Sequence, residues 1–161
     1  MASGDSLLVF DPLSNRPPTV DYASVDLRNG FVVLDFDDTT DEKAFFQAVV
    51  PSHYRGGQLL AVVTWTSSTA TTGDAQFRVE TTRLNSGVNL DALPAVDGSG
   101  DVTGTAPATS GQLVVSQTPF INAGGAVAGD LLLIGLTRLA STGADTLVGD
   151  TEFVSLEIRE A

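Results

Sequence analysis

The feature that most constrains this chain is a strict alternation of apolar and polar residues in short runs that end at turn residues. In Ala75–Leu84 the apolar Ala75, Phe77 and Val79 alternate with polar side chains, and Glu152–Arg159 repeats the pattern. Successive side chains of a β-strand point to opposite faces, so a period of two means one buried and one solvated face. The pattern predicts strands, each with one face in a core.

Eight short β-type runs, the two alternating ones among them, are separated by turn signals such as Asn29-Gly30 and Pro51. Together they predict an all-β fold, a two-sheet antiparallel β-sandwich of jelly-roll type with about eight strands. The length of 161 residues fits a single domain. The runs are Ser6–Phe10, Phe31–Phe36, Ala44–Val50, Gln58–Thr66, Ala75–Leu84, Gln112–Thr118, Asp130–Leu139 and Glu152–Arg159.

Three segments need a separate interpretation. Residues 1–20 contain Pro12, Pro17 and Pro18 and are expected to form an extended N-terminal arm that contacts a partner, with residues 21–161 forming the sandwich. Asp41–Val50 could form a helix, but its β-branched end before Pro51 favours a strand. Asn85–Ser110 is rich in small residues and is expected to be a long functional loop, which could hold a short strand near Leu90–Val96 or reach onto a neighbouring subunit.

The charge balance excludes one class of partner. Twenty acidic residues face eight basic ones, for a net charge of −12, and Lys43 is the single lysine. Binding to nucleic acid depends on clustered cations that replace the counterions of phosphates, and this sequence has no such cluster. We therefore expect no nucleic-acid partner, and the same sign of charge disfavours an anionic membrane.

The chain has no cysteine, which excludes disulfides and sulfur-ligated metals. Its first residues lack a basic start and a long apolar stretch, so we expect no signal peptide. The longest apolar run, near Leu131–Leu136, is too short to cross a bilayer.

An acidic cluster is the best candidate for a metal site. Carboxylates at this density can bind Ca²⁺, which takes six to eight oxygen ligands. An EF-hand loop starting at Asp35 would need glycine where Thr40 stands and glutamate where Phe46 stands, so that motif is absent. The favoured interpretation is a solvated turn whose side chains bond local backbone amides, and no metal is expected. The cluster comprises Asp35, Asp37, Asp38, Asp41 and Glu42.

Catalytic residues are not indicated. His53 is the single histidine, and no Gly-x-Ser-x-Gly turn presents a nucleophile. His53 is expected in an exposed turn after Pro51. Trp65 and Phe77 could form a sugar-stacking platform, but their apolar strands favour core packing. We expect a protein that is not an enzyme and uses no cofactor.

Parts of the sequence resemble a group of small structural proteins of tailed bacteriophages. The resemblance rests on Phe36–Glu42, on Val50–Gly57 leading into the Trp65 strand, and on Val127–Asp130 and Asp145–Asp150 near the end. Phe45 and Arg138 also fit, and the resemblance covers about Leu34 to Arg159.

This resemblance implies a jelly-roll virion protein, most specifically a capsid decoration (cement) protein. Such a protein would be made in the host cytoplasm and would bind the major capsid protein on the capsid surface as a homotrimer, which stabilises the head. The alternative is a tail-tip, head-fibre or receptor-binding module that attaches to a host glycan through its loops. An enzyme is a third possibility that no residue pattern requires.

Overall fold

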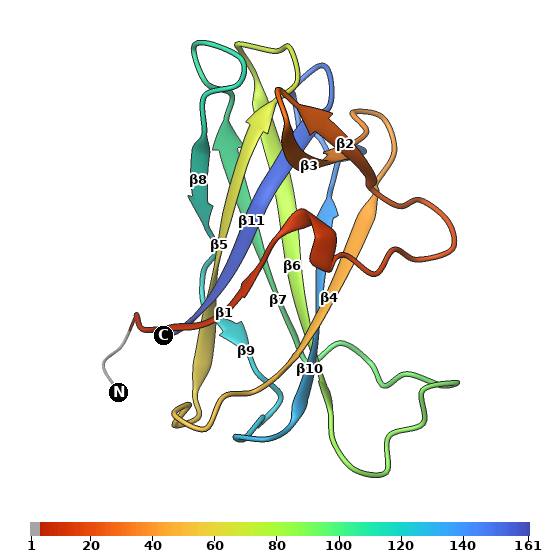
Figure 1. Ribbon diagram of the computed structural model, residues 1–161, viewed down its shortest axis with the longest axis vertical. Coiled ribbons are helices and arrows are strands. Elements are labelled where there is room, and N and C mark those ends of the chain that lie inside the picture. The colour runs from red at the N-terminus through yellow and green to blue at the C-terminus, as the bar shows by residue number, and fades with distance from the viewer. Residues whose placement is uncertain (1–3) are drawn as a thin grey trace.

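The computed structural model describes residues 4–161, which form eleven strands and one short 3-10 helix, η1 (Pro12–Ser14) (Figure 1). No helix in this part of the chain is long and apolar enough to span a membrane. The strands are β1 (Ser6–Phe10), β2 (Ser24–Arg28), β3 (Phe31–Phe36), β4 (Lys43–Val49), β5 (Gln58–Ser67), β6 (Asp74–Leu84), β7 (Gly98–Thr105), β8 (Val114–Gln117), β9 (Ile121–Asn122), β10 (Leu131–Arg138) and β11 (Thr151–Glu160).

The strands form two antiparallel sheets, as the alternation predicted. The seven-stranded sheet has the order β2-β3-β11-β5-β8, with β1 paired to β11 and β9 paired to β5. The four-stranded sheet has the order β4-β10-β6-β7. The prediction of an all-β sandwich is confirmed, and Asp41–Val50 contributes the strand β4 rather than a helix.

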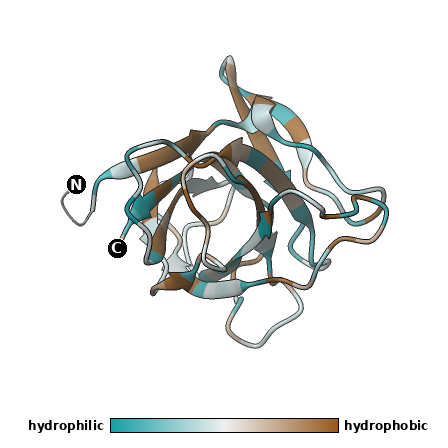
Figure 2. Cartoon of the chain, turned by 90° about the horizontal axis from the view of Figure 1, so that it is seen from below, coloured by the Kyte–Doolittle hydropathy of each residue, from teal (hydrophilic) through white to brown (hydrophobic). Residues whose placement is uncertain are grey.

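The core lies between the sheets and is built from the inward positions of the long strands. Trp65 and Phe77 are fully buried with ring centroids 5.6 Å apart, and the indole N–H of Trp65 donates to Ser116 Oγ. Figure 2, viewed along the sandwich, shows hydrophobic residues on strands all around the interior. Trp65 and Phe77 are therefore core residues and form no sugar platform.

Three strands lie where no strand was predicted: β2, β7 and β9. Strand β7 falls inside the segment expected to be a loop, and no strand forms near Leu90–Val96, where a short one was possible. The glycines of β7 explain the difference. A Cβ on Gly100 would lie 3.0 Å from Ile121 Cγ1, and one on Gly104 would lie 2.9 Å from Trp65 Cζ2. Glycine is needed where the edges of the two sheets approach each other closely. Because glycine is uncommon in strands, it also makes a strand harder to predict from sequence.

Residues 4–20, the described part of the expected N-terminal arm, pack against the sandwich. Strand β1 pairs with β11, and Phe10 stacks on Phe46 with centroids 5.2 Å apart. The segment then crosses to the other sheet, where Asn15 Oδ1 accepts from the amide of Phe45 and the amide of Arg16 donates to the Phe45 carbonyl at 2.7 Å. This part of the chain therefore closes one edge of the sandwich and covers the free edge of β4, while residues 1–3 of the expected arm lie outside the described residues.

Candidate functional site

The outward face of the four-stranded sheet gathers polar side chains around one gap. Strand register places Gly135 of β10 between Phe45 of β4 and Glu80 of β6. The next row holds Lys43, Thr137 and Arg78. Each of these positions alternates with a buried one, so local alternation orients the side chains outward and strand order makes them neighbours.

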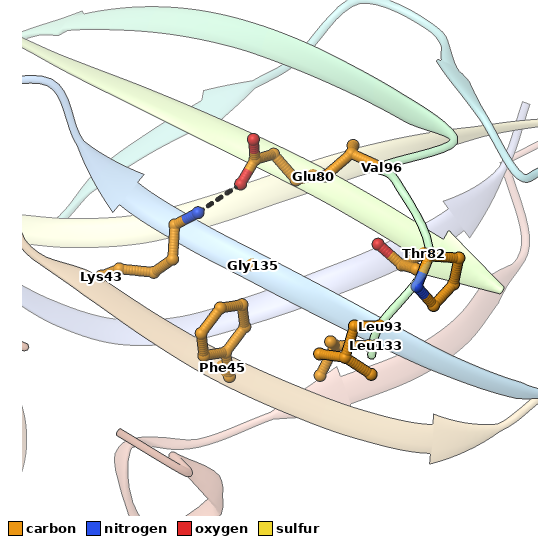
Figure 3. Close-up of a pocket in the computed structure, with 9 residues that line it drawn as sticks. Lys43, Phe45, Glu80, Thr82, Leu93, Val96, Leu133 and Gly135 are labelled. Carbon is orange, nitrogen blue, oxygen red and sulfur yellow. Dashed lines mark hydrogen bonds and ion pairs between the residues drawn. The ribbon is translucent and has the colours of Figure 1, made fainter. Parts of the chain in front are cut away.

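A pocket of about 120 Å³ opens at Gly135 (Figure 3). A Cβ at this position would lie 3.3 Å from Glu80 Oε2 and 3.4 Å from Phe45 Cε1, so the missing side chain is what leaves the space between them. The lining residues are Lys43, Phe45, Glu80, Thr82, Leu93, Pro94, Val96, Leu133 and Gly135. We call this surface the Gly135 face.

Charged groups at the pocket are fixed by one another. Lys43 Nζ donates to Glu80 Oε2 at 2.6 Å and lies 5.3 Å from the centroid of the Phe45 ring (Figure 3). Nearby, Arg78 donates two hydrogen bonds to the Asp101 carboxylate, at 2.7 and 2.8 Å. The bonds from Arg78 hold the pKa of Asp101 below its ordinary value. The face therefore offers oriented donors and acceptors beside an aromatic ring.

Thr137 adds a polar group that is not used within the described chain. Its Oγ1 is buried and has no hydrogen-bond partner among residues 4–161. Register places it between Lys43 and Arg78. A buried hydroxyl without a partner is uncommon, because its desolvation is not offset. This hydroxyl is a buried, unpaired polar group beside the Gly135 face.

Residues 85–97 form one wall of the pocket. Leu93, Pro94 and Val96 line it, although Leu93 and Val96 remain about half exposed. This loop is the first half of the segment expected to be functional; the second half became β7. A loop held beside a rigid sheet is a common way to build a binding site.

The acidic cluster is divided between different places. Asp37, Asp38 and Asp150 bring carboxylate oxygens within 4.8 Å of one another, a grouping that could hold a cation. Asp35 lies elsewhere, on the outward face of the seven-stranded sheet opposite Glu152. Asp41 instead accepts from the amide and hydroxyl of Ser141 at 2.8 and 3.0 Å.

Only Asp37 bonds its own turn. The hydroxyl and amide of Thr39 and the amide of Thr40 donate to Asp37 Oδ1, and these bonds lower the pKa of Asp37. The amide of the distant Gly149 donates to Asp38 Oδ2 at 2.5 Å. Burial, followed by the charges of Asp37 and Asp38, raises the pKa of Asp150. The favoured interpretation, a turn that bonds its own backbone, therefore fits Asp37, whereas Asp38 and Asp41 bond distant segments.

No arrangement for nucleophilic catalysis was predicted from His53, and the structure places that residue in the exposed turn between β4 and β5. Sequence reasoning missed Phe45, Glu80 and Gly135 as site residues. One sequence feature could have pointed to this site: Lys43, which begins a strand, is the single lysine of an acidic chain. Its partner Glu80, 37 residues away, could not be identified without the order of the strands.

Comparison with known proteins finds a solved structure with a similar fold. No protein family matches the chain, and no curated protein matches it. Among solved structures it is similar to the K3 cleaved adhesin domain of Lys-gingipain from Porphyromonas gingivalis, with 10% identity and a TM-score of 0.53, over 98% of this chain and 99% of that one.

Two further solved structures are more distant. TmCBM61 in complex with β-1,4-galactotriose shares 12% identity at a TM-score of 0.45, over 95% of this chain and 88% of that one. The mannan-recognising carbohydrate-binding module TmCBM27 shares 8% identity at a TM-score of 0.40, with the same coverage of 95% and 88%. The adhesin domain, with the higher score and near-complete coverage, shares the β-sandwich architecture of this chain.

Proposed function

We propose that this protein is a non-catalytic adhesion module that binds a carbohydrate through the Gly135 face. The observation that carries the proposal is the pocket at Gly135, with the Phe45 ring on one side and the Lys43–Glu80 pair on the other. A sugar ring has an apolar C–H face and a rim of hydroxyls. An aromatic ring suits the first, and paired donors and acceptors suit the second.

The fold agrees with this proposal. The solved structure that shares the architecture is described as an adhesin domain. A rigid sheet also suits recognition, because its side chains are held in place before the ligand arrives and lose little freedom on binding. The fixed ion pair between Lys43 and Glu80 is ordered in this way.

The resemblance to phage structural proteins supports a more specific version of the proposal. In a virion, an adhesion module would belong to a tail tip or head fibre and would bind a glycan of the host surface. The capsid decoration protein, a homotrimer on the major capsid protein, is the second candidate. Its support is that resemblance together with large exposed apolar side chains around β3 and β8, such as Phe31 and Val115.

The test is a glycan array followed by calorimetric titration of any glycan that binds. Gly135→Leu would fill the pocket, and Glu80→Gln would remove the charge of the acceptor while it keeps the shape. We expect each to weaken binding at least about tenfold, equivalent to about 1.4 kcal/mol. Gln117→Ala, an exposed change on β8 of the other sheet, is the control and should bind like the wild type.

The outcomes separate the candidate functions. Binding that Gly135→Leu abolishes supports the adhesion module. An array without any binding, combined with saturable binding of the protein to undecorated phage heads, would favour the decoration protein. Hydrolysis of a bound glycan would contradict both.

A further inference from the structure

A second apolar surface lies on the opposite side of the sandwich, on the outward face of the seven-stranded sheet. Three large side chains there are largely exposed: Phe31 at 74%, Leu113 at 61% and Val115 at 65%. We call these three residues the hairpin patch. Phe31 and Leu113 also line a pocket of about 270 Å³, whose other lining residues are Arg28, Val32, Val33, Thr66, Gly111 and Val154.

The patch is built on an ordered framework. Arg28 Nη1 donates to the carbonyls of Ser67 and Ser68 at 3.0 and 3.2 Å and to Glu152 Oε2 at 2.5 Å, which fixes the end of β2 against β5 and β11. Strand register shifts between Phe153 and Ser155, and this irregularity leaves Val154 at the pocket. The surface is thus held by hydrogen bonds and register before any partner binds.

The size of the hairpin patch matches a protein interface. Three large apolar side chains exposed by about two-thirds present on the order of 400 Å² of apolar surface. One side of a standard interface covers about 800 Å², of which roughly 57% is apolar, or about 450 Å². This patch is therefore large enough to form most of the apolar part of one side of such an interface.

We propose that the hairpin patch is the contact between copies of this chain. The patch combines a projecting aromatic ring with a pocket wide enough to receive one, since a cavity of about 150 Å³ already holds benzene. A surface with both a knob and a hole can be complementary to itself, as contacts between identical subunits require. Phe31 of one copy would enter the pocket beside Leu113 of the next.

Charge makes contact between copies depend on salt. With a net charge of −12, two copies repel one another over most orientations. At the hairpin patch Arg28 pairs with Glu152, and the three residues that define the patch are uncharged. Asp26 and Asp35 lie further along the same face, so like-charge repulsion opposes the contact. Screening of this repulsion by salt should therefore strengthen association.

This inference does not depend on the proposed carbohydrate function. The hairpin patch and the Gly135 face are on opposite sheets, so assembly through the first leaves the second open. Joined copies would then present several identical binding faces, and such multivalency raises avidity without any new contact to the ligand.

The test is the mass in solution, measured by sedimentation equilibrium over a range of protein concentrations at low and high salt. The wild type should exceed 16.7 kDa, with association that tightens as salt rises. Phe31→Ser and Leu113→Ser should each weaken association at least about tenfold. Leu90→Ser is the matched control, because Leu90 is 71% exposed but lies on the 85–97 loop.

Cysteine protection gives a second measurement, because the native chain contains no cysteine. Leu113→Cys should react more slowly with a thiol reagent as protein concentration rises, whereas Leu90→Cys should react at a constant rate. A wild type that stays at 16.7 kDa at every concentration would overturn the proposal. So would association that Phe31→Ser leaves intact or that Leu90→Ser disrupts equally. Glycan binding by a monomer would contradict this inference alone.

Discussion

At the scale of single residues, buried charge has its clearest consequences at Asp35 and Arg138. Burial, followed by the charges of Glu152 and Asp26, raises the pKa of Asp35 from 3.8 to about 7. Asp35 Oδ1 is buried and has no hydrogen-bond partner within the described chain. A folded state that holds a proton which the unfolded chain releases becomes less stable as pH rises.

Asp35→Asn should therefore stabilise the protein at pH 8. Between about pH 4 and pH 7 the folded wild type binds one more proton at Asp35 than the unfolded chain, so its free energy of unfolding falls across this window. The amide side chain carries no charge and avoids this loss. After allowance for solvent screening we expect a gain of about 1–2 kcal/mol at pH 8 in urea unfolding.

The gain from Asp35→Asn should vanish near pH 3, where Asp35 is protonated in the folded state and largely so in the unfolded one. Asp91→Asn, on an exposed loop, serves as the control. An equal effect of Asp35→Asn at both pH values would show that the change acts through packing and that the proton is not involved.

Arg138→Met should be strongly destabilising. Arg138 is fully buried and donates to Asp145, to the carbonyls of Phe36 and Leu147, and to that of Gly149 at 2.8 Å. Loss of the guanidinium leaves a buried carboxylate without its counter-charge. We expect the free energy of unfolding to fall by about 3–5 kcal/mol. In a double-mutant cycle, adding Asp145→Asn should cost much less than it does in the wild type; full additivity would contradict a coupled pair.

At the scale of elements, the sequence of β7 is determined by the close approach of the other sheet rather than by the β-propensity of its residues. A Cβ on Gly104 would meet Ser116 Oγ and Trp65 Cζ2, so the two sheets could not close as they do. Gly104→Ala should lower the free energy of unfolding by about 1–3 kcal/mol through overpacking. Gly143→Ala is the control, because nothing lies within 4 Å of a Cβ there. Equal thermal midpoints for the two variants would argue against this packing constraint.

At the scale of the whole molecule, the N-terminal segment completes the sandwich. Phe10 is buried, stacks on Phe46 and extends an aromatic cluster to Phe153, whose ring centroid is 5.6 Å from that of Phe46. Strand β1 also supplies the neighbour of the second half of β11.

Removal of residues 1–10 should therefore destabilise the whole domain. We expect a loss of about 3 kcal/mol or more in chemical denaturation, comparable to the loss of a buried phenylalanine, together with loss of the strand that pairs with β11. Phe10→Ala tests the aromatic contribution alone. A truncated protein that unfolds at the same denaturant concentration would contradict this contribution of the segment to the stability of the domain.

The sequence by itself determined the fold class and most strands, because the period-two alternation records which side chains a strand buries. Strand β3 was predicted with its observed limits, Phe31–Phe36. The predicted run Ala75–Leu84 is one residue shorter than the observed strand β6. Strand β7 was not predicted, because its glycines make room for side chains of residues that are distant in sequence. The tertiary structure alone decided which strands lie side by side. Lys43 meets Glu80, and Asp37 meets Asp150, because β-pairing joins distant segments through packing that no local pattern encodes.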